Sequence, residues 1–143
     1  MTRNRASAKA AGTRAESDVA TVTLTFTIPH DKWLSSNQRL HWAPKKDRTK
    51  WIRARGFMVA IILNPKQYAG PVQITAHIGY PSNAKADPNN AAPTTKALID
   101  GLVEAGMFID DSHEWVLGPD HRRDTEKAPR GFHTVRLEIE EVE

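Results

Sequence analysis

Residues 72–106 read VQITAHIGYPSNAKADPNNAAPTTKALIDGLVEAG, and this stretch decides the fold. Apolar and polar side chains alternate over 72–80, which predicts a strand with one buried face. A helix follows, because Asn90 is a good N-cap, Pro93 suits a first turn and Gly106 suits a left-handed cap. The buried face of this helix would consist of Leu98, Ile99, Leu102 and Val103. A strand that runs directly into an amphipathic helix predicts two packed layers.

The flanking sequence supplies the other elements. Strands are predicted near 22–28, where apolar residues alternate with threonine, and at 135–139. A helix is predicted from Pro44 to about Leu63, with one apolar stripe made of Trp51, Ala54, Met58, Ile61 and Ile62. A short strand is predicted at 115–117, and the polar residues 118–131 are predicted to form a long loop or hairpin tip. The expected fold is α+β in two layers, a mixed sheet of about four strands packed by two helices.

Length and composition place these elements in one domain. The chain has 143 residues, of which 39% are hydrophobic, enough for a core of its own. We expect residues 20–143 to form the domain and residues 1–19 to be a disordered basic tail, either an inert extension or an arm that contacts phosphates. No apolar run approaches the roughly 20 residues of a membrane helix. The absence of cysteine suits a reducing compartment, so we expect a cytoplasmic protein without a membrane partner.

Positive charge is concentrated in one block of the sequence. The formal net charge of +3 permits a nucleic-acid partner but does not require one. Between residues 45 and 55 only Asp47 opposes the basic residues Lys45, Lys46, Arg48, Lys50, Arg53 and Arg55. Such a block predicts contacts with phosphates that weaken as salt is added.

Two acidic clusters border the predicted helix. Asp87-Pro88-Asn89-Asn90 precedes it, and Asp110-Asp111 follows it. Taken singly, each cluster is typical of a solvated turn. Together they favour a magnesium site, because Mg²⁺ prefers oxygen ligands and a neighbouring strand can fold the second pair back toward the first. Lys96 on the helix would then stabilise negative charge on a phosphate.

The order of these motifs resembles that of the RusA-like Holliday junction resolvases, endonucleases that are often encoded by phages. That family carries an acidic Asp-x-Asp-Asn motif, a lysine on the following helix, an Asp-Ala-Leu motif and a pair of aspartates. Their counterparts here are Asp87–Asn90, Lys96, Asp100–Leu102 and Asp110–Asp111. The segment Ser35–Trp42 is similar to a polar segment that follows the first strand of the family. The resemblance covers residues 21–142.

The resemblance implies a homodimer that cuts opposed strands of a four-way DNA junction in recombination and repair. Mg²⁺, or Mn²⁺ in its place, would be held by Asp87, Asn89, Asp110 and Asp111. The catalytic residues would be Asp87, Asp111 and Lys96. The DNA would be contacted by Asn37, Arg39, Lys45, Lys46, Arg48, Lys50 and Arg53.

The residues themselves leave two functions open. The second acidic position of the family's motif is Asn89 here, and an amide oxygen ligates Mg²⁺ without the charge that helps to bind the ion. The chain is therefore either a metal-dependent junction endonuclease or a branched-DNA-binding protein of the same fold that has lost the ability to cut.

Overall fold

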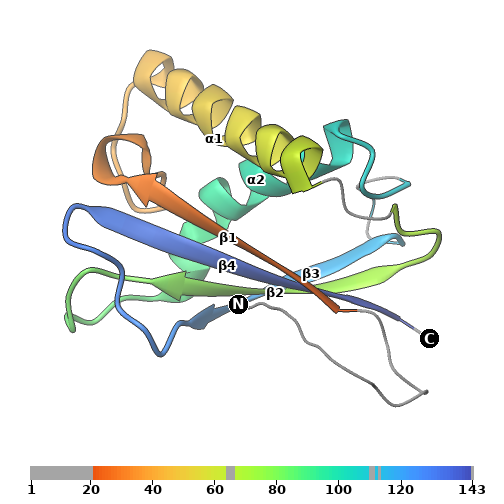
Figure 1. Cartoon of the computed structure of the whole chain (residues 1–143). Coiled ribbons are helices and arrows are strands. Elements are labelled where there is room, and N and C mark those ends of the chain that lie inside the picture. The colour runs from red at the N-terminus through yellow and green to blue at the C-terminus, as the bar shows by residue number, and fades with distance from the viewer. Residues whose placement is uncertain (1–20, 64–66, 110–111, 113, 143) are drawn as a thin grey trace.

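The structure, a computed structural model, describes residues 21–63, 67–109, 112 and 114–142. It is a four-stranded sheet with two helices packed on one of its faces (Figure 1). The elements in chain order are β1 Thr21–Pro29, η1 His30–Lys32, α1 Trp42–Leu63, β2 Val72–Gly79, η2 Pro88–Ala91, α2 Ala92–Glu104, β3 Val116–Arg123 and β4 Phe132–Glu141. The predicted α+β class and the order of the main elements are confirmed. Across the described ranges, no helix combines the length and the apolar character needed to cross a membrane.

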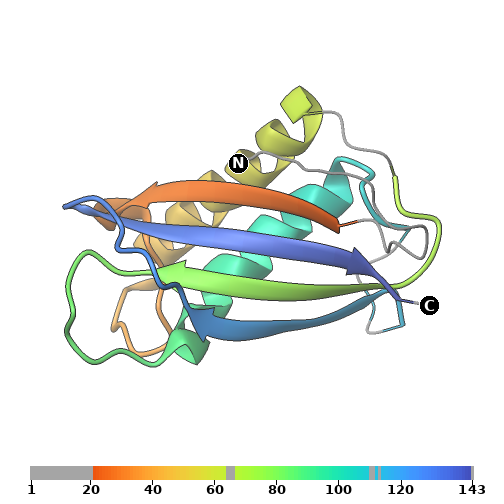
Figure 2. The ribbon, with the colours of Figure 1, turned by 60° about the horizontal axis from the view of Figure 1, so that its bottom comes forward.

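The sheet is mixed, with the strand order β1-β4-β2-β3 (Figure 2). Strand β4 is antiparallel to both β1 and β2, so that Leu24 pairs with Leu137 and Ile74 pairs with Ile139. Strand β3 pairs with β2 in parallel. A parallel pair needs a crossover connection, and α2 lies within the crossover between these two strands. The side chains that alternate inward from β1, β2 and β4 form the core beneath the two helices.

The two helices approach each other closely at two glycines. A Cβ on Gly56 of α1 would clash with the backbone carbonyl of Leu98 on α2, and a Cβ on Gly101 of α2 would clash with the backbone of Arg53 and Phe57 on α1. Glycine is therefore required at this crossing because any larger side chain would push the helix axes apart.

The face that α1 buries differs from the predicted one. Of the expected stripe, Met58, Ile61 and Ile62 are 53%, 54% and 71% exposed, whereas Ile52, Gly56 and Ala60 are buried. The prediction followed the bulkiest apolar side chains. The helix instead turns a face with two small residues toward α2, because small side chains allow the close approach.

Strand β3 is longer than predicted. Residues 118–131 were expected to form a loop, but β3 continues through Gly118 and Pro119 to Arg123, and only residues 124–131 connect it to β4. The Gly-Pro dipeptide reads as a turn in sequence. An edge strand tolerates proline because one side of the strand donates no hydrogen bonds to a neighbour.

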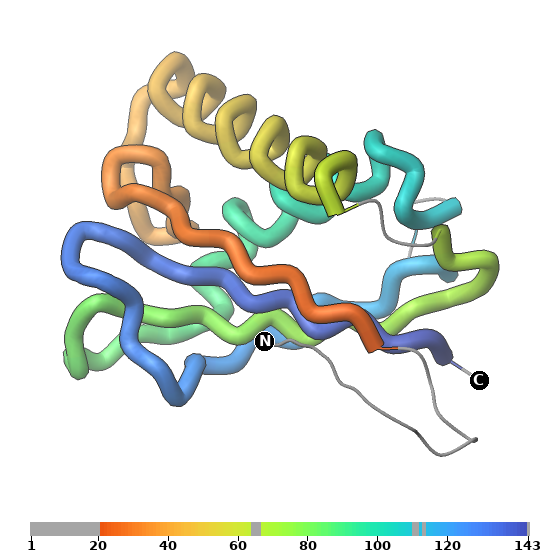
Figure 3. Tube along the Cα trace, viewed as in Figure 1, coloured from red at the N-terminus to blue at the C-terminus, as the bar shows by residue number. Residues whose placement is uncertain are grey.

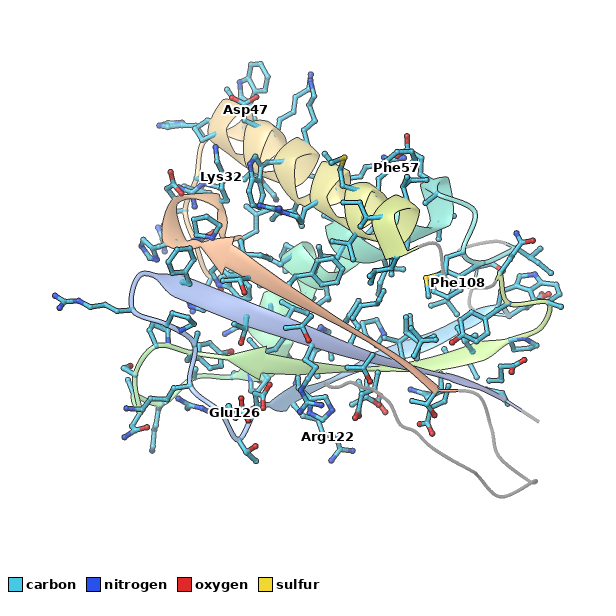
Figure 4. The ribbon with its side chains drawn as sticks, viewed as in Figure 1. Lys32, Asp47, Phe57, Phe108, Arg122 and Glu126 are labelled. Atoms are coloured by element: carbon cyan, nitrogen blue, oxygen red, sulfur yellow. The ribbon has the colours of Figure 1, made fainter. Side chains whose placement is uncertain are left out.

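The face of the sheet that the helices leave open is polar. Arg136 on β4 contacts Asp124 and Glu138 at 3.3 Å each, and Glu138 Oε1 lies 2.7 Å from His77 Nε2. Figure 4 shows Arg122 and Glu126 on this open side, whereas Phe57 lies on the helical side. Burial raises the pKa of Asp124, but the hydrogen bonds from Arg136 and the Glu126 backbone outweigh it and hold that pKa below its ordinary value.

Gly56→Ala tests the helix crossing. An ordinary glycine-to-alanine change in a helix raises stability by roughly 0.5–1 kcal/mol. Here we expect the free energy of unfolding to fall by about 1–3 kcal/mol, because the new methyl group overpacks against the α2 backbone.

The measurement is urea unfolding, with Gly70→Ala as the matched control because a Cβ there meets nothing within 4 Å. Equal stability of the two variants would contradict the proposed close contact.

Candidate functional site

The candidate site begins where β2 ends, in the loop that leads to α2. Asp87 has an extended backbone, as expected for a residue before proline, and its Oδ1 accepts a hydrogen bond from the Asn89 N–H at 3.0 Å. Asp87 thereby caps the short 3-10 helix η2, and its side chain remains exposed. Capping is a structural role, and it also holds the carboxylate at one place at the end of the sheet.

The start of α2 differs in detail from the sequence prediction. Ala91, rather than Asn90, occupies the N-cap, because Asn90 belongs to η2, which runs directly into α2. Pro93 does lie in the first turn, and Gly106 has the expected positive φ of 87°. The helix therefore begins about one residue later than the side-chain pattern alone predicts.

A loop from far upstream in the sequence is fastened to this helix start. The Thr94 hydroxyl donates to the Leu34 carbonyl at 2.7 Å and accepts from the Leu34 N–H at 3.0 Å. The Ser36 N–H donates to the Asn90 carbonyl at 2.8 Å. Thr94 is fully buried, so these bonds hold residues 34–38 beside the Asp87 segment. Asn37, which the resemblance assigns to DNA binding, is brought next to the acidic motif in this way.

Strand β3 adds two residues that the sequence analysis missed, Asp120 and His121. His121 Nε2 lies 2.8 Å from the hydroxyl of Thr95 on α2. The same hydroxyl lies 3.2 Å from the Ala92 carbonyl, so it links the His121 ring to the first turn of α2. The sequence contains a signal for this strand, because less exposed and more exposed side chains alternate beyond Gly118. The sequence analysis interpreted the segment as a loop.

The environment of His121 keeps its ring uncharged. Burial lowers the pKa of His121 below its ordinary value, and the carboxylates of Asp120 and Asp87 oppose this only in part. Both carboxylates therefore lie close enough to act on the ring. At neutral pH the site presents an uncharged imidazole, in which one nitrogen has a lone pair that can accept a proton.

The motif lies between concave surfaces on both of its sides. On one side is a groove of about 640 Å³, the Tyr80 groove, whose lining includes Trp33, Asn37, Tyr80, Lys85, Asp87 and Arg123. On the other side are two hollows of about 470 and 310 Å³ that share Pro119 and His121. The larger hollow also contains Asn89 and Asp120, and the smaller one contains Lys96 and Asp100.

Lys96 therefore shares a hollow with His121. Its side chain is 76% exposed, and its ammonium lies 3.6 Å from the Asp100 carboxylate one turn along the helix. An exposed pair of this kind contributes little to stability and is easily exchanged for another anion.

Asp110 and Asp111 lie outside the described residues. The described residues around them are held at the start of β2, where the Tyr68 N–H donates to the Met107 carbonyl and the Val72 N–H donates to the Trp115 carbonyl. The loop that joins β2 to η2, which contains Asp87, lies at the other end of β2 and leads into the start of α2 (Figure 3). A helix of 13 residues spans about 20 Å. Within the described chain, β3 contributes Asp120 and His121 to the surroundings of Asp87.

The basic block is divided by the structure into two sets. Arg48 donates to the Trp33 carbonyl at 2.8 Å, Arg53 pairs with Glu104 at 2.9 Å, and Arg55 lies over the Trp51 ring. Arg48 thereby fastens α1 to the Trp33 segment, whereas the Arg53 pair is exposed on both sides and contributes little to stability. Lys45, Lys46 and Lys50 are also exposed on α1, and Arg39 is exposed on the preceding loop.

The donor set around Asp87 is compatible with Mg²⁺. Asp87, Asn89 and Asp120 offer carboxylate and amide oxygens, the ligands that this ion prefers. Among the described residues, no three His, Asp or Glu side chains converge closely enough to enclose a metal. Mg²⁺ does not require such a cage, because it usually keeps several waters and binds one or two carboxylates together with a substrate phosphate.

Comparison with known proteins adds no assignment: no family of known proteins matches the chain, and no characterised protein matches it significantly.

The proximity of Asp87 to His121 can be tested without any substrate. We expect an NMR titration to give a His121 pKa below its ordinary value of about 6.5, because burial disfavours the imidazolium. Asp87→Asn should lower that pKa further, since it removes a negative charge that favours protonation. Folding stability linked to His121 should be complete above about pH 6.5 and decrease as the pH falls toward the folded-state pKa.

The matched control is Asp31→Asn, an exposed aspartate on η1. An identical His121 pKa in all three proteins would mean that Asp87 and His121 do not belong to one site.

Proposed function

We propose that the chain is a Mg²⁺-dependent, structure-specific DNA endonuclease that acts in the cytoplasm and cuts opposed strands of four-way junctions. The proposal rests above all on one observation: Asn89, Asp120 and His121 line one hollow, and Asp87 lies close enough to influence the His121 ring. Oxygen donors beside an uncharged imidazole suit the hydrolysis of a phosphodiester. The resemblance of the motif order to the RusA-like resolvases supports the same reaction.

Each side chain has a role that follows from its chemistry. We assign to His121 the tautomer that donates from Nε2 to Thr95 and leaves a lone pair on Nδ1, so that Nδ1 accepts the proton of the attacking water. The exposed ammonium of Lys96 leaves Asp100 and stabilises the negative charge that develops on the phosphate. Thr95 fixes the orientation of the His121 ring through the Nε2 hydrogen bond.

The magnesium ion would be held by Asp87 and Asn89, with a second carboxylate either from the Asp110-Asp111 pair that the resemblance implies or from Asp120 on β3. Bound there, Mg²⁺ supplies positive charge next to the phosphate and lowers the pKa of a water ligand. The negative charge of Asp87 anchors the ion, whereas Asn89 contributes only a dipole.

The DNA would follow the basic surface of the molecule. Lys45, Lys46 and Lys50 are exposed on α1 and contact phosphates, and Arg39 and Asn37 extend this surface toward the acidic motif. A homodimer suits the two-fold symmetry of a junction, because each protomer then cuts one of two opposed strands.

A second function has specific support. Asn89 stands at the second acidic position of the motif, where an amide oxygen provides no charge to help bind the ion. A protein that binds branched DNA without cutting it would have this composition. The cleavage assay below separates the two functions.

Asp87→Asn tests the endonuclease proposal. A labelled synthetic four-way junction is incubated with the protein in Mg²⁺ and in EDTA. We expect paired nicks only in Mg²⁺, and we expect Asp87→Asn to lower the cleavage rate by at least about a hundredfold, since it removes the charge that anchors the ion. Binding measured by fluorescence anisotropy in EDTA should be retained.

The control for the lost charge is again Asp31→Asn, which should cut like the parent protein. Binding of the junction without nicks in Mg²⁺ or Mn²⁺ would establish the non-catalytic function instead. Failure to bind the junction at all would reject both functions.

A pair of variants identifies the carboxylate that completes the metal site. If the metal ligands are those that the resemblance to the RusA-like resolvases implies, Asp111→Asn should abolish cleavage and Asp120→Asn should retain most of it. The reverse result would assign the second charge to β3, where Asp120 shares a hollow with Asn89. The readout is the cleavage rate over a range of Mg²⁺ concentrations, which should be lost at every concentration for whichever variant has lost a ligand.

A further inference from the structure

We propose that the Tyr80 groove binds a single unpaired nucleotide next to the phosphate that is cut. This inference rests on the proposed function and extends it, because it names the feature of branched DNA that the protein recognises. The groove borders Asp87 and Asn90 directly, so its occupant lies beside the acidic motif. It is separate from the hollows that contain His121 and Lys96.

The size of the groove suits one nucleotide. Its volume of about 640 Å³ lies within the range of roughly 300–1,000 Å³ that is typical of sites for small organic ligands. A paired duplex does not fit into such a hollow. A base that has left the stack does, and its own phosphate would then lie near Asp87.

One wall of the groove is made of aromatic rings and one guanidinium. Tyr80 is half-buried, the Arg123 guanidinium lies over its ring at 4.9 Å from the centroid, and the His133 ring meets it in a T-shaped arrangement with 5.5 Å between the centroids. Behind them the His133 ring stacks on buried Trp33 at 4.2 Å. Burial, reinforced by nearby His30, lowers the pKa of His133 to about 4, so this ring is neutral at physiological pH. Aromatic and guanidinium planes are the surfaces on which unpaired bases stack.

The loop that forms the rim is held in place before any ligand binds. Arg123 Nη1 donates to the Ala84 carbonyl and Nη2 donates to the Ser82 carbonyl, both at 2.8 Å. This single side chain therefore fastens the loop between β2 and Asp87 to the end of β3. Because this loop is already ordered, it loses less conformational entropy when a ligand binds.

The polar groups of the rim match the rest of a nucleotide. Lys85 is exposed on the fastened loop and places a positive charge where a phosphate would lie. Asn37 and Asn90 provide amide groups that can donate to or accept from the edge of a base. An aromatic wall, a cation and amides together fit a nucleotide better than they fit an apolar ligand or a peptide.

The consequence for recognition is a preference for unpaired DNA. Extracting a base from a duplex costs energy that a single strand or the centre of a junction does not require. The groove would thus favour branched over fully paired DNA without reading sequence, because every base has a face that can stack.

Tyr80→Leu and Tyr80→Phe test the stacking wall. The probe is a short thymidine oligonucleotide that contains one 2-aminopurine, whose fluorescence changes when it stacks, titrated in EDTA so that no cleavage occurs. We expect the parent protein and Tyr80→Phe to bind alike, and Tyr80→Leu to bind about tenfold more weakly, since it keeps apolar bulk but loses the aromatic face.

A second pair of variants guards against misfolding of Tyr80→Leu. Lys85→Ala should reduce the salt dependence of binding by about one phosphate contact, whereas Lys127→Ala, an equally exposed lysine outside the groove, should not. Unchanged binding in both Tyr80→Leu and Lys85→Ala would overturn the proposal, as would a parent protein that does not bind the probe.

The junction-cleavage assay separates the two proposals. A protein that cuts junctions but does not bind the probe retains the endonuclease function and rejects the nucleotide groove. A protein that binds the probe through Tyr80 but cuts nothing in Mg²⁺ or Mn²⁺ retains the groove and rejects the endonuclease.

Discussion

The parallel pairing of β3 with β2 is the constraint on which the rest of the structure depends. Because parallel neighbours cannot be joined by a hairpin, α2 has to cross the sheet, and β3 has to return to run alongside β2. That return brings His121 next to Thr95 and into range of Asp87, which follows the end of β2. It also brings Arg123 to the loop that precedes Asp87. The candidate site is thus assembled because the crossover places β3 beside β2.

The site combines exposed charges with a rigid support. Asp87, Asn89 and Lys96 are exposed, and exposed ion pairs add little to stability, so these side chains are available for a ligand. Their backbone, by contrast, is held by the buried hydroxyl of Thr94 and by η2. The close approach of α1 and α2 at two glycines fixes α2, which carries Lys96 and directly follows the segment that contains Asp87 and Asn89. The positions of these exposed side chains are therefore fixed by buried contacts of the backbone that carries them.

The errors in the sequence analysis have identifiable physical causes. The buried face of α1 was assigned to its largest apolar side chains, whereas the close contact with α2 selects the face that contains Gly56 and Ala60. The end of β3 was taken for a loop because Gly118 and Pro119 are typical of turns, although an edge strand accepts both. That second error removed His121 and Asp120 from the candidate site.

The local patterns of this sequence determined most of its helices and strands and much of the Asp87–Asn90 motif. Alternation and helical spacing depend on neighbouring residues, so they predicted the strands apart from the end of β3, both helices and the α+β class. The assembly of the site was decided by tertiary structure. Which strand lies beside Asp87, which face of α1 is buried and where Arg123 donates all depend on contacts between residues distant in sequence. Such contacts arise from packing and crossover geometry, and no local pattern encodes them.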